Sequence, residues 1–125
     1  GKTGPLLGAA SSALLNALKK LAGIDQEIDL VSARAIEPIQ TLKTNYLGSR
    51  NPRLHTDEIL IALSSSAAEN ETAAIALRQL SKLKGCDMHS TVILSSVDTD
   101  TLKRLGMYLT CEPAYEQEDR KYHKL

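Results

Sequence analysis

A strand–helix–strand pattern between residues 88 and 112 constrains the fold of this chain more than any other feature. Residues 91–94 form a short β-branched run of the kind found in buried strands. Asp98 is expected to cap a helix after this run, and residues 107–112 then alternate apolar and polar side chains. Because the connection contains a helix, we expect two parallel strands with a right-handed crossover.

Amphipathic helices are predicted to precede this unit. Residues 5–22 carry one apolar stripe at helical spacing, and Pro5 suits the first turn of a helix, where its missing N–H costs nothing. Residues 28–31 are a candidate for a short strand. Ser32 is expected to cap a second helix, in which Pro38 causes either a late start or a kink.

A polar loop and two further helices are predicted in the middle of the chain. Residues 48–55 form the loop by composition, and Thr56 is the expected N-cap of the helix that follows. Asn70 is predicted to divide residues 57–84 into two helices. Together these elements predict a single α/β domain over residues 1–115, followed by a charged tail over residues 116–125.

The composition argues against two classes of partner. Lys+Arg and Asp+Glu each number 15, so the formal net charge is zero, whereas nucleic-acid-binding domains usually carry a basic excess. The longest apolar runs, such as residues 59–63, are far shorter than the roughly 20 residues of a membrane-spanning helix. Two cysteines do not make a disulfide framework, which predicts a cytoplasmic protein with reduced thiols. We therefore expect neither a nucleic-acid nor a membrane partner.

The segment 50–58 is the strongest candidate for a functional site. Two arginines and an amide beside a helix N-terminus could hold an anion such as phosphate or carboxylate, and the predicted ligands are Arg50, Asn51 and Arg53. His55 and Asp57 are the predicted catalytic residues, because a histidine can exchange a proton near neutral pH. The alternative is a solvated loop whose carboxylates only complement the helix dipole.

The first residues resemble the end of a phosphate-binding loop. In such loops, backbone N–H groups and a lysine surround phosphates at the N-terminus of a helix. Lys2 and Thr3 therefore join the predicted anion-binding residues. The full motif also requires an earlier glycine and a preceding strand, and without them these residues simply precede an ordinary helix.

Three residues near the strand–helix–strand unit could ligate zinc. Cys86 and His89 have Cys-x-x-His spacing, and Cys111 lies in the second predicted strand, with His55 or water as a fourth ligand. Structural zinc sites usually pair close ligands on both sides, whereas one side here supplies a single cysteine. The alternative is that both cysteines are small buried apolar residues. No metal or other cofactor is assigned.

Several segments together resemble the C-terminal region of a bacterial family, the domain of unknown function 1846 family. The resemblance rests on residues 6–21, 36–39, 46–58, 84–86, 89–94 and 109–113. It implies the last part of a protein several times longer, which agrees with a chain that begins without an initiator Met. It also implies a three-layer α-β-α module around a small mixed or parallel sheet, with a topology of the cytidine-deaminase type.

Deaminase chemistry is not expected from this resemblance. A zinc deaminase needs His-x-Glu and Pro-Cys-x-x-Cys, whereas here Glu58 lies one position too far from His55 and no Cys-x-x-Cys occurs. Two hypotheses remain, and enzymatic activity stays open between them. Either the domain contributes to an anion- or nucleotide-binding site shared with the remainder of the parent chain, or it is a structural module that packs on that chain or forms a homo-oligomer.

Overall fold

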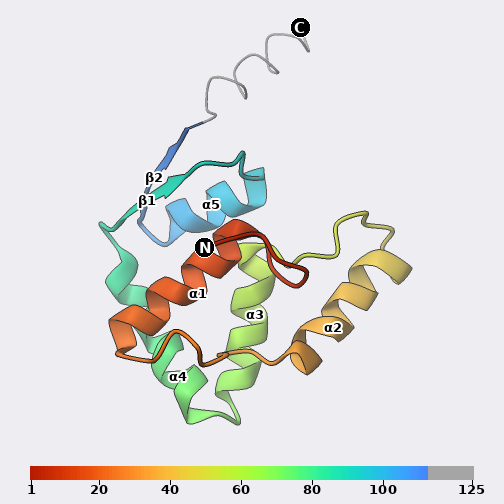
Figure 1. Ribbon diagram of the computed structural model, residues 1–125, viewed down its shortest axis with the longest axis horizontal. Helices are drawn as coiled ribbons and strands as arrows, with labels where there is room; N and C mark the ends of the chain where they lie inside the picture. The colour runs from red at the N-terminus through yellow and green to blue at the C-terminus, as the bar shows by residue number, and fades with distance from the viewer. Residues whose placement is uncertain (113–125) are drawn as a thin grey trace, which may run out of the picture.

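The computed structural model describes residues 1–112 and confirms the predicted α/β class (Figure 1). The predicted tail, residues 116–125, lies outside the described residues. The elements, in chain order, are α1 (Ala9–Ala22), α2 (Ala33–Thr41), the π-helical turn η1 (Leu42–Tyr46), α3 (Thr56–Ala67), α4 (Glu71–Leu77), the 3-10 segment η2 (Arg78–Leu83), β1 (Asp87–Ser90), α5 (Ser96–Arg104) and β2 (Tyr108–Cys111).

The two strands are parallel, as predicted, and α5 forms the connection between them. Their register pairs Asp87 with Tyr108 and Ser90 with Cys111. The first strand, however, lies before the predicted segment 91–94. Ser90 Oγ donates to the carbonyl of Val92 at 2.6 Å and accepts the Val92 N–H at 3.2 Å. These bonds turn the chain out of the sheet after Ser90, whose partner Cys111 is the last residue of β2.

The N-terminal segment is extended rather than helical, so the prediction of a helix from residue 5 is wrong. The N–H of Leu54 donates to the carbonyl of Leu6 at 3.0 Å, and the N–H of Gly8 donates to the carbonyl of Leu54 at 3.4 Å. These bonds hold residues 6–8 beside the polar loop, and α1 begins only at Ala9. The loop is thereby fixed next to the start of α1.

The strand predicted at residues 28–31 is absent. The apolar residues of this segment serve burial rather than strand pairing. Leu30 and Val31 are buried in the core, yet the segment pairs with no strand. Ser32 caps α2 as predicted, accepting the N–H of Ala35 at 3.3 Å. Of the two effects predicted for Pro38, a late start or a kink, the late start is wrong, because α2 begins at Ala33 and contains Pro38.

Three further helix starts were predicted from capping residues, with mixed success. Asn70 caps α4 through the N–H groups of Thr72 and Ala73, at 2.9 and 3.2 Å, so two helices occupy residues 57–84 as expected. The N-cap of α3 is His55 rather than Thr56, and that of α5 is Ser95 rather than Asp98. Thr56 and Asp98 instead bond to each other, because Asp98 Oδ1 accepts the N–H and the hydroxyl of Thr56.

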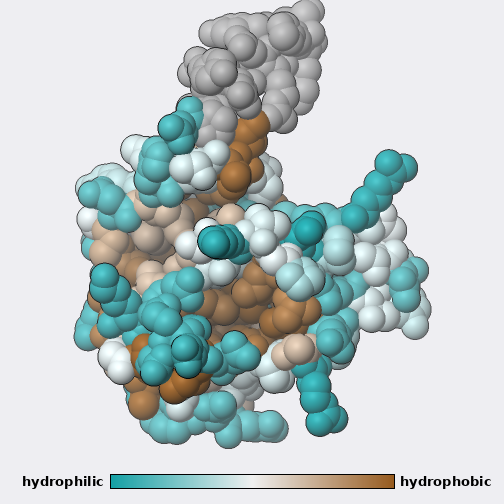
Figure 2. Space-filling view, viewed as in Figure 1, coloured by the Kyte–Doolittle hydropathy of each residue, from teal (hydrophilic) through white to brown (hydrophobic). Residues whose placement is uncertain are grey.

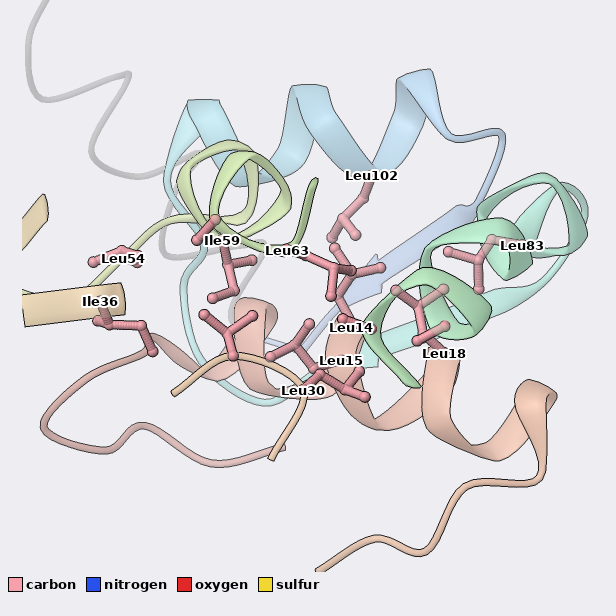
Figure 3. Close-up of a cluster of buried hydrophobic side chains, with 14 of the residues drawn as sticks. Leu14, Leu15, Leu18, Leu30, Ile36, Leu54, Ile59, Leu63, Leu83 and Leu102 are labelled. Carbon is pink, nitrogen blue, oxygen red and sulfur yellow. The ribbon is translucent and has the colours of Figure 1, made fainter. Parts of the chain in front are cut away.

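The core is aliphatic, and α1, α3 and α5 contribute to it together with α4 and η2. Leu14, Leu63 and Leu102 point toward one another from α1, α3 and α5, and each is fully buried (Figure 3). The N-termini of these three helices border one cleft, described next. The core thus sets the spacing of the elements that carry the candidate site.

Candidate functional site

A cleft of about 440 Å³ opens where α1, α3 and α5 begin. Its lining includes the residues at or next to those starts, Gly8, His55 and Ser95, together with loop residues 50, 51 and 53. Helix N-termini carry the positive end of the helix dipole, and at the start of α1 no side chain of the described residues caps the first N–H groups. The volume lies within the range of small-molecule sites, about 300–1,000 Å³. The cleft therefore has the size and polarity to receive a small anion.

Both predicted arginines line this cleft. Arg53 Nε donates to the carbonyl of Gly4 at 2.6 Å, and the Arg53 N–H donates to Asn51 Oδ1 at 3.1 Å. These bonds fix the Arg53 backbone and stem but use only one guanidinium nitrogen. Within residues 1–112, neither Arg50 nor Arg53 forms a salt bridge with a carboxylate. Among the described residues, no carboxylate therefore neutralises either guanidinium group.

His55 lines the same cleft and faces the carboxylate of Asp98, a residue whose position in the sequence predicts only helix capping. His55 Nδ1 lies 3.6 Å from Asp98 Oδ2, and the Asp98 side chain is 10% exposed. The other oxygen, Oδ1, accepts both the N–H and the hydroxyl of Thr56, each at 2.8 Å. Asp98 thus joins the start of α5 to the start of α3. No local sequence signal could indicate a contact across this many residues.

The remaining predicted site residues lie at different distances from this cleft. Thr3 lines it, and Thr3 and Lys2 both line an adjoining hollow of about 300 Å³ against β1. Asp57 is exposed on the first turn of α3, where its Oδ1 accepts the N–H of Glu58 at 2.8 Å. Asp57 does not line the cleft, and its catalytic role stays a prediction.

The candidate zinc ligands have separate partners. Cys86 Sγ donates to the carbonyl of Lys82 at 3.5 Å, and Cys111 Sγ donates to that of Val92 at 3.3 Å. His89 Nδ1 lies 2.8 Å from Thr110 Oγ1. In the part of the chain that the structure describes, no three His, Cys, Asp or Glu residues are arranged to hold a metal ion. Over the same residues, no helix is long and apolar enough to cross a membrane.

Comparison with known proteins places the chain in a family. A family model described as the C-terminal part of the domain of unknown function DUF1846 matches residues 1–121. The chain belongs to the DUF1846 family. This result confirms the resemblance drawn from the sequence. The topology of the deaminase type, which that resemblance implied, stays a prediction.

The DUF1846 domain described here has bacterial relatives that are much longer. It is 59% identical to a UPF0371 protein of Corynebacterium glutamicum over 94% of this chain and 24% of the relative. It is 51% identical to a UPF0371 protein of Streptococcus sanguinis over 99% of this chain and 25% of the relative. The chain thus spans about a quarter of the length of the curated relatives it matches.

Proposed function

We propose that this DUF1846 domain contributes one wall of an anion-binding site, whose ligand is a phosphate-bearing small molecule such as a nucleotide. The observation that carries the proposal is that Arg50, Arg53 and His55 line one cleft with the start of α1. No side chain of the described residues caps α1, since its N-cap is Gly8, so backbone N–H groups there add to the positive potential.

The charge balance of the cleft supports an anionic ligand. Two arginines line it, against the single carboxylate of Asp98. That carboxylate is already occupied, because it accepts two hydrogen bonds from Thr56 and faces His55. Guanidinium groups bind phosphate and carboxylate oxygens in bidentate geometry. Because the matching relatives are about four times longer, the remainder of such a chain is proposed to supply the opposite wall.

The test is the binding of inorganic sulfate and phosphate to the full-length protein, measured by isothermal titration calorimetry. Arg50→Ala is the main variant because Arg50 is exposed and forms no salt bridge with another described residue. Loss of one charge-assisted hydrogen bond is expected to weaken binding about tenfold. Arg34→Ala, an exposed arginine on α2 away from the cleft, is the matched control. Equal affinities for the native protein and both variants would refute the proposal.

An assembly role is the second candidate, and exposed apolar residues favour it. Tyr46, Leu47 and Ile61 are 78%, 71% and 67% exposed. On the face drawn in Figure 2, apolar side chains also gather in the middle, between hydrophilic ones. The proposed occupant of such surfaces is the remainder of the parent chain. Limited proteolysis tests this role: Leu47→Asp is expected to speed cleavage between the domain and the rest, and an unchanged rate would argue against it.

The predicted cytoplasmic location belongs with these proposals. It is supported by the two free cysteines of the described residues, each bonded to a backbone carbonyl. Fractionation of cells that produce the full-length protein tests it, and recovery outside the cytoplasmic fraction would exclude it.

A further inference from the structure

The two carboxylate oxygens of Asp98 contact different residues. Oδ1 is held by the N–H and the hydroxyl of Thr56, both at 2.8 Å. Oδ2 faces His55 Nδ1 at 3.6 Å. The backbone N–H of Asp98 is in turn fixed by Ser95 Oγ at 3.2 Å. With its backbone and one oxygen both anchored, the side chain has little freedom to turn its second oxygen away from the imidazole.

Other groups near His55 do not take this position: the Glu58 N–H faces the His55 side chain in the capping box of α3 but forms no hydrogen bond to it. Glu58 Oε1 accepts the backbone N–H of His55 and pairs with Lys43 at 2.8 Å. Arg50 and Arg53 line the same cleft but are cations. Of the carboxylates in residues 1–112, Asp98 is the one within ion-pair distance of the ring.

We propose that Asp98 is a positioning residue that keeps a proton on His55 Nδ1, so that Nε2 is the proton acceptor of the anion cleft. A carboxylate beside one ring nitrogen fixes the tautomer of a histidine and leaves the lone pair on the other nitrogen. This inference rests on the proposed function and adds the ligand class: an anion that carries a hydroxyl proton near its charged group.

Acylation by diethyl pyrocarbonate tests the assignment, because this reagent attacks the ring nitrogen that bears the lone pair. The rate at His55 is followed by peptide mass spectrometry on the full-length protein. Asp98→Asn is the decisive variant: its carbonyl oxygen can still accept from Thr56, whereas its amide presents N–H donors to Nδ1. The ring proton then moves to Nε2, and the acylation rate at His55 is expected to fall about tenfold, the effect of a tenfold tautomer bias.

His89 provides an internal control for the reactivity of the reagent. It is exposed on β1 with Thr110 as its partner, away from Asp98, so its rate should be equal in both proteins. An unchanged His55 rate in Asp98→Asn overturns the assignment. If the variant unfolds, as circular dichroism would reveal, the native protein alone provides the test. Its ¹⁵N-histidine NMR spectrum, assigned with His55→Gln, must show the proton on Nδ1, and a proton on Nε2 overturns the proposal.

Experiments with sulfate distinguish a failure of this inference from a failure of the proposed function. Sulfate binding together with an unchanged His55 rate in Asp98→Asn refutes the Asp98 role alone. A tenfold lower rate without any sulfate or phosphate binding supports the Asp98 role and refutes the anion site. Protection of native His55 from acylation by sulfate, with His89 unprotected, supports both.

Discussion

Glu58 Oε1 lies 2.8 Å from Lys43 Nζ and 2.7 Å from the backbone nitrogen of His55. One carboxylate oxygen therefore joins η1 to the N-cap of α3. Lys43 Nζ also donates to the carbonyl of Arg53, within the polar loop. These contacts hold the loop between two helical segments, so that its arginines and His55 are presented from a fixed backbone.

Glu58→Ala is expected to destabilise the protein through this cluster. The Lys43 side chain is 9% exposed and that of Glu58 is 24% exposed, so the substitution leaves a mostly buried ammonium without its partner. We expect the free energy of unfolding to fall by about 2–3 kcal/mol, somewhat less than for a fully buried pair. Urea denaturation of the full-length protein measures it.

Asp57→Ala is the matched control for this experiment. It removes the neighbouring carboxylate, which is exposed and bonds only to the adjacent N–H. Its expected effect is within about 0.5 kcal/mol. Equal effects of the two substitutions would show that the Lys43–Glu58 pair does not stabilise the loop.

Two glycines with the same backbone conformation offer a matched pair of substitutions. Gly85 and Gly106 both have φ of +83°, so alanine is strained at either position. At Gly106 the new Cβ would also lie 2.9 Å from Cγ and 3.2 Å from Cα of Lys84, whereas at Gly85 nothing lies within 4 Å. We expect Gly106→Ala to cost about 1 kcal/mol more than Gly85→Ala in thermal or urea unfolding. Equal costs would mean that Lys84 moves aside freely.

Much of the helical structure was predictable because its signals are local. The apolar stripe that includes Leu14 and Leu18 marks the buried face of α1, and Asn70 caps α4 through N–H groups two and three residues away. Strand positions were less predictable because a strand needs a partner. Residues 91–94 have the stronger β propensity, yet β1 forms at Asp87–Ser90, where β2 is available for pairing.

The candidate site was likewise predictable only where its signals are local. The polar composition of residues 50–55 identified the arginines and His55, all of which line the cleft. The partner of the imidazole is Asp98, brought to it by the packing of α5 against α3, which no spacing rule encodes. For the same reason, the spacing of Cys86, His89 and Cys111 did not indicate that their side chains have separate partners.

Asn70→Ala is expected to weaken the start of α4. The Asn70 side chain accepts two N–H groups of the first turn, which would otherwise lack a partner within the helix. We expect a loss of about 1 kcal/mol in the free energy of unfolding. Asn70→Asp keeps the accepting oxygen and is expected to retain native stability. A loss of equal size in both variants would contradict the capping role.

Ser11→Ala tests how the start of α1 is tied to the polar loop. Ser11 is fully buried, and its Oγ donates to the carbonyl of Leu54 at 2.8 Å, directly before His55. Removing the hydroxyl leaves that carbonyl with the longer bond from Gly8, at 3.4 Å. We therefore expect a loss of about 1 kcal/mol, measured by urea denaturation. Ser64→Ala, at an exposed position of α3, is the control and should be neutral or slightly stabilising, because alanine favours helices. If Ser11→Ala were equally neutral, the backbone bonds of residues 6–8 alone would fix the loop against α1.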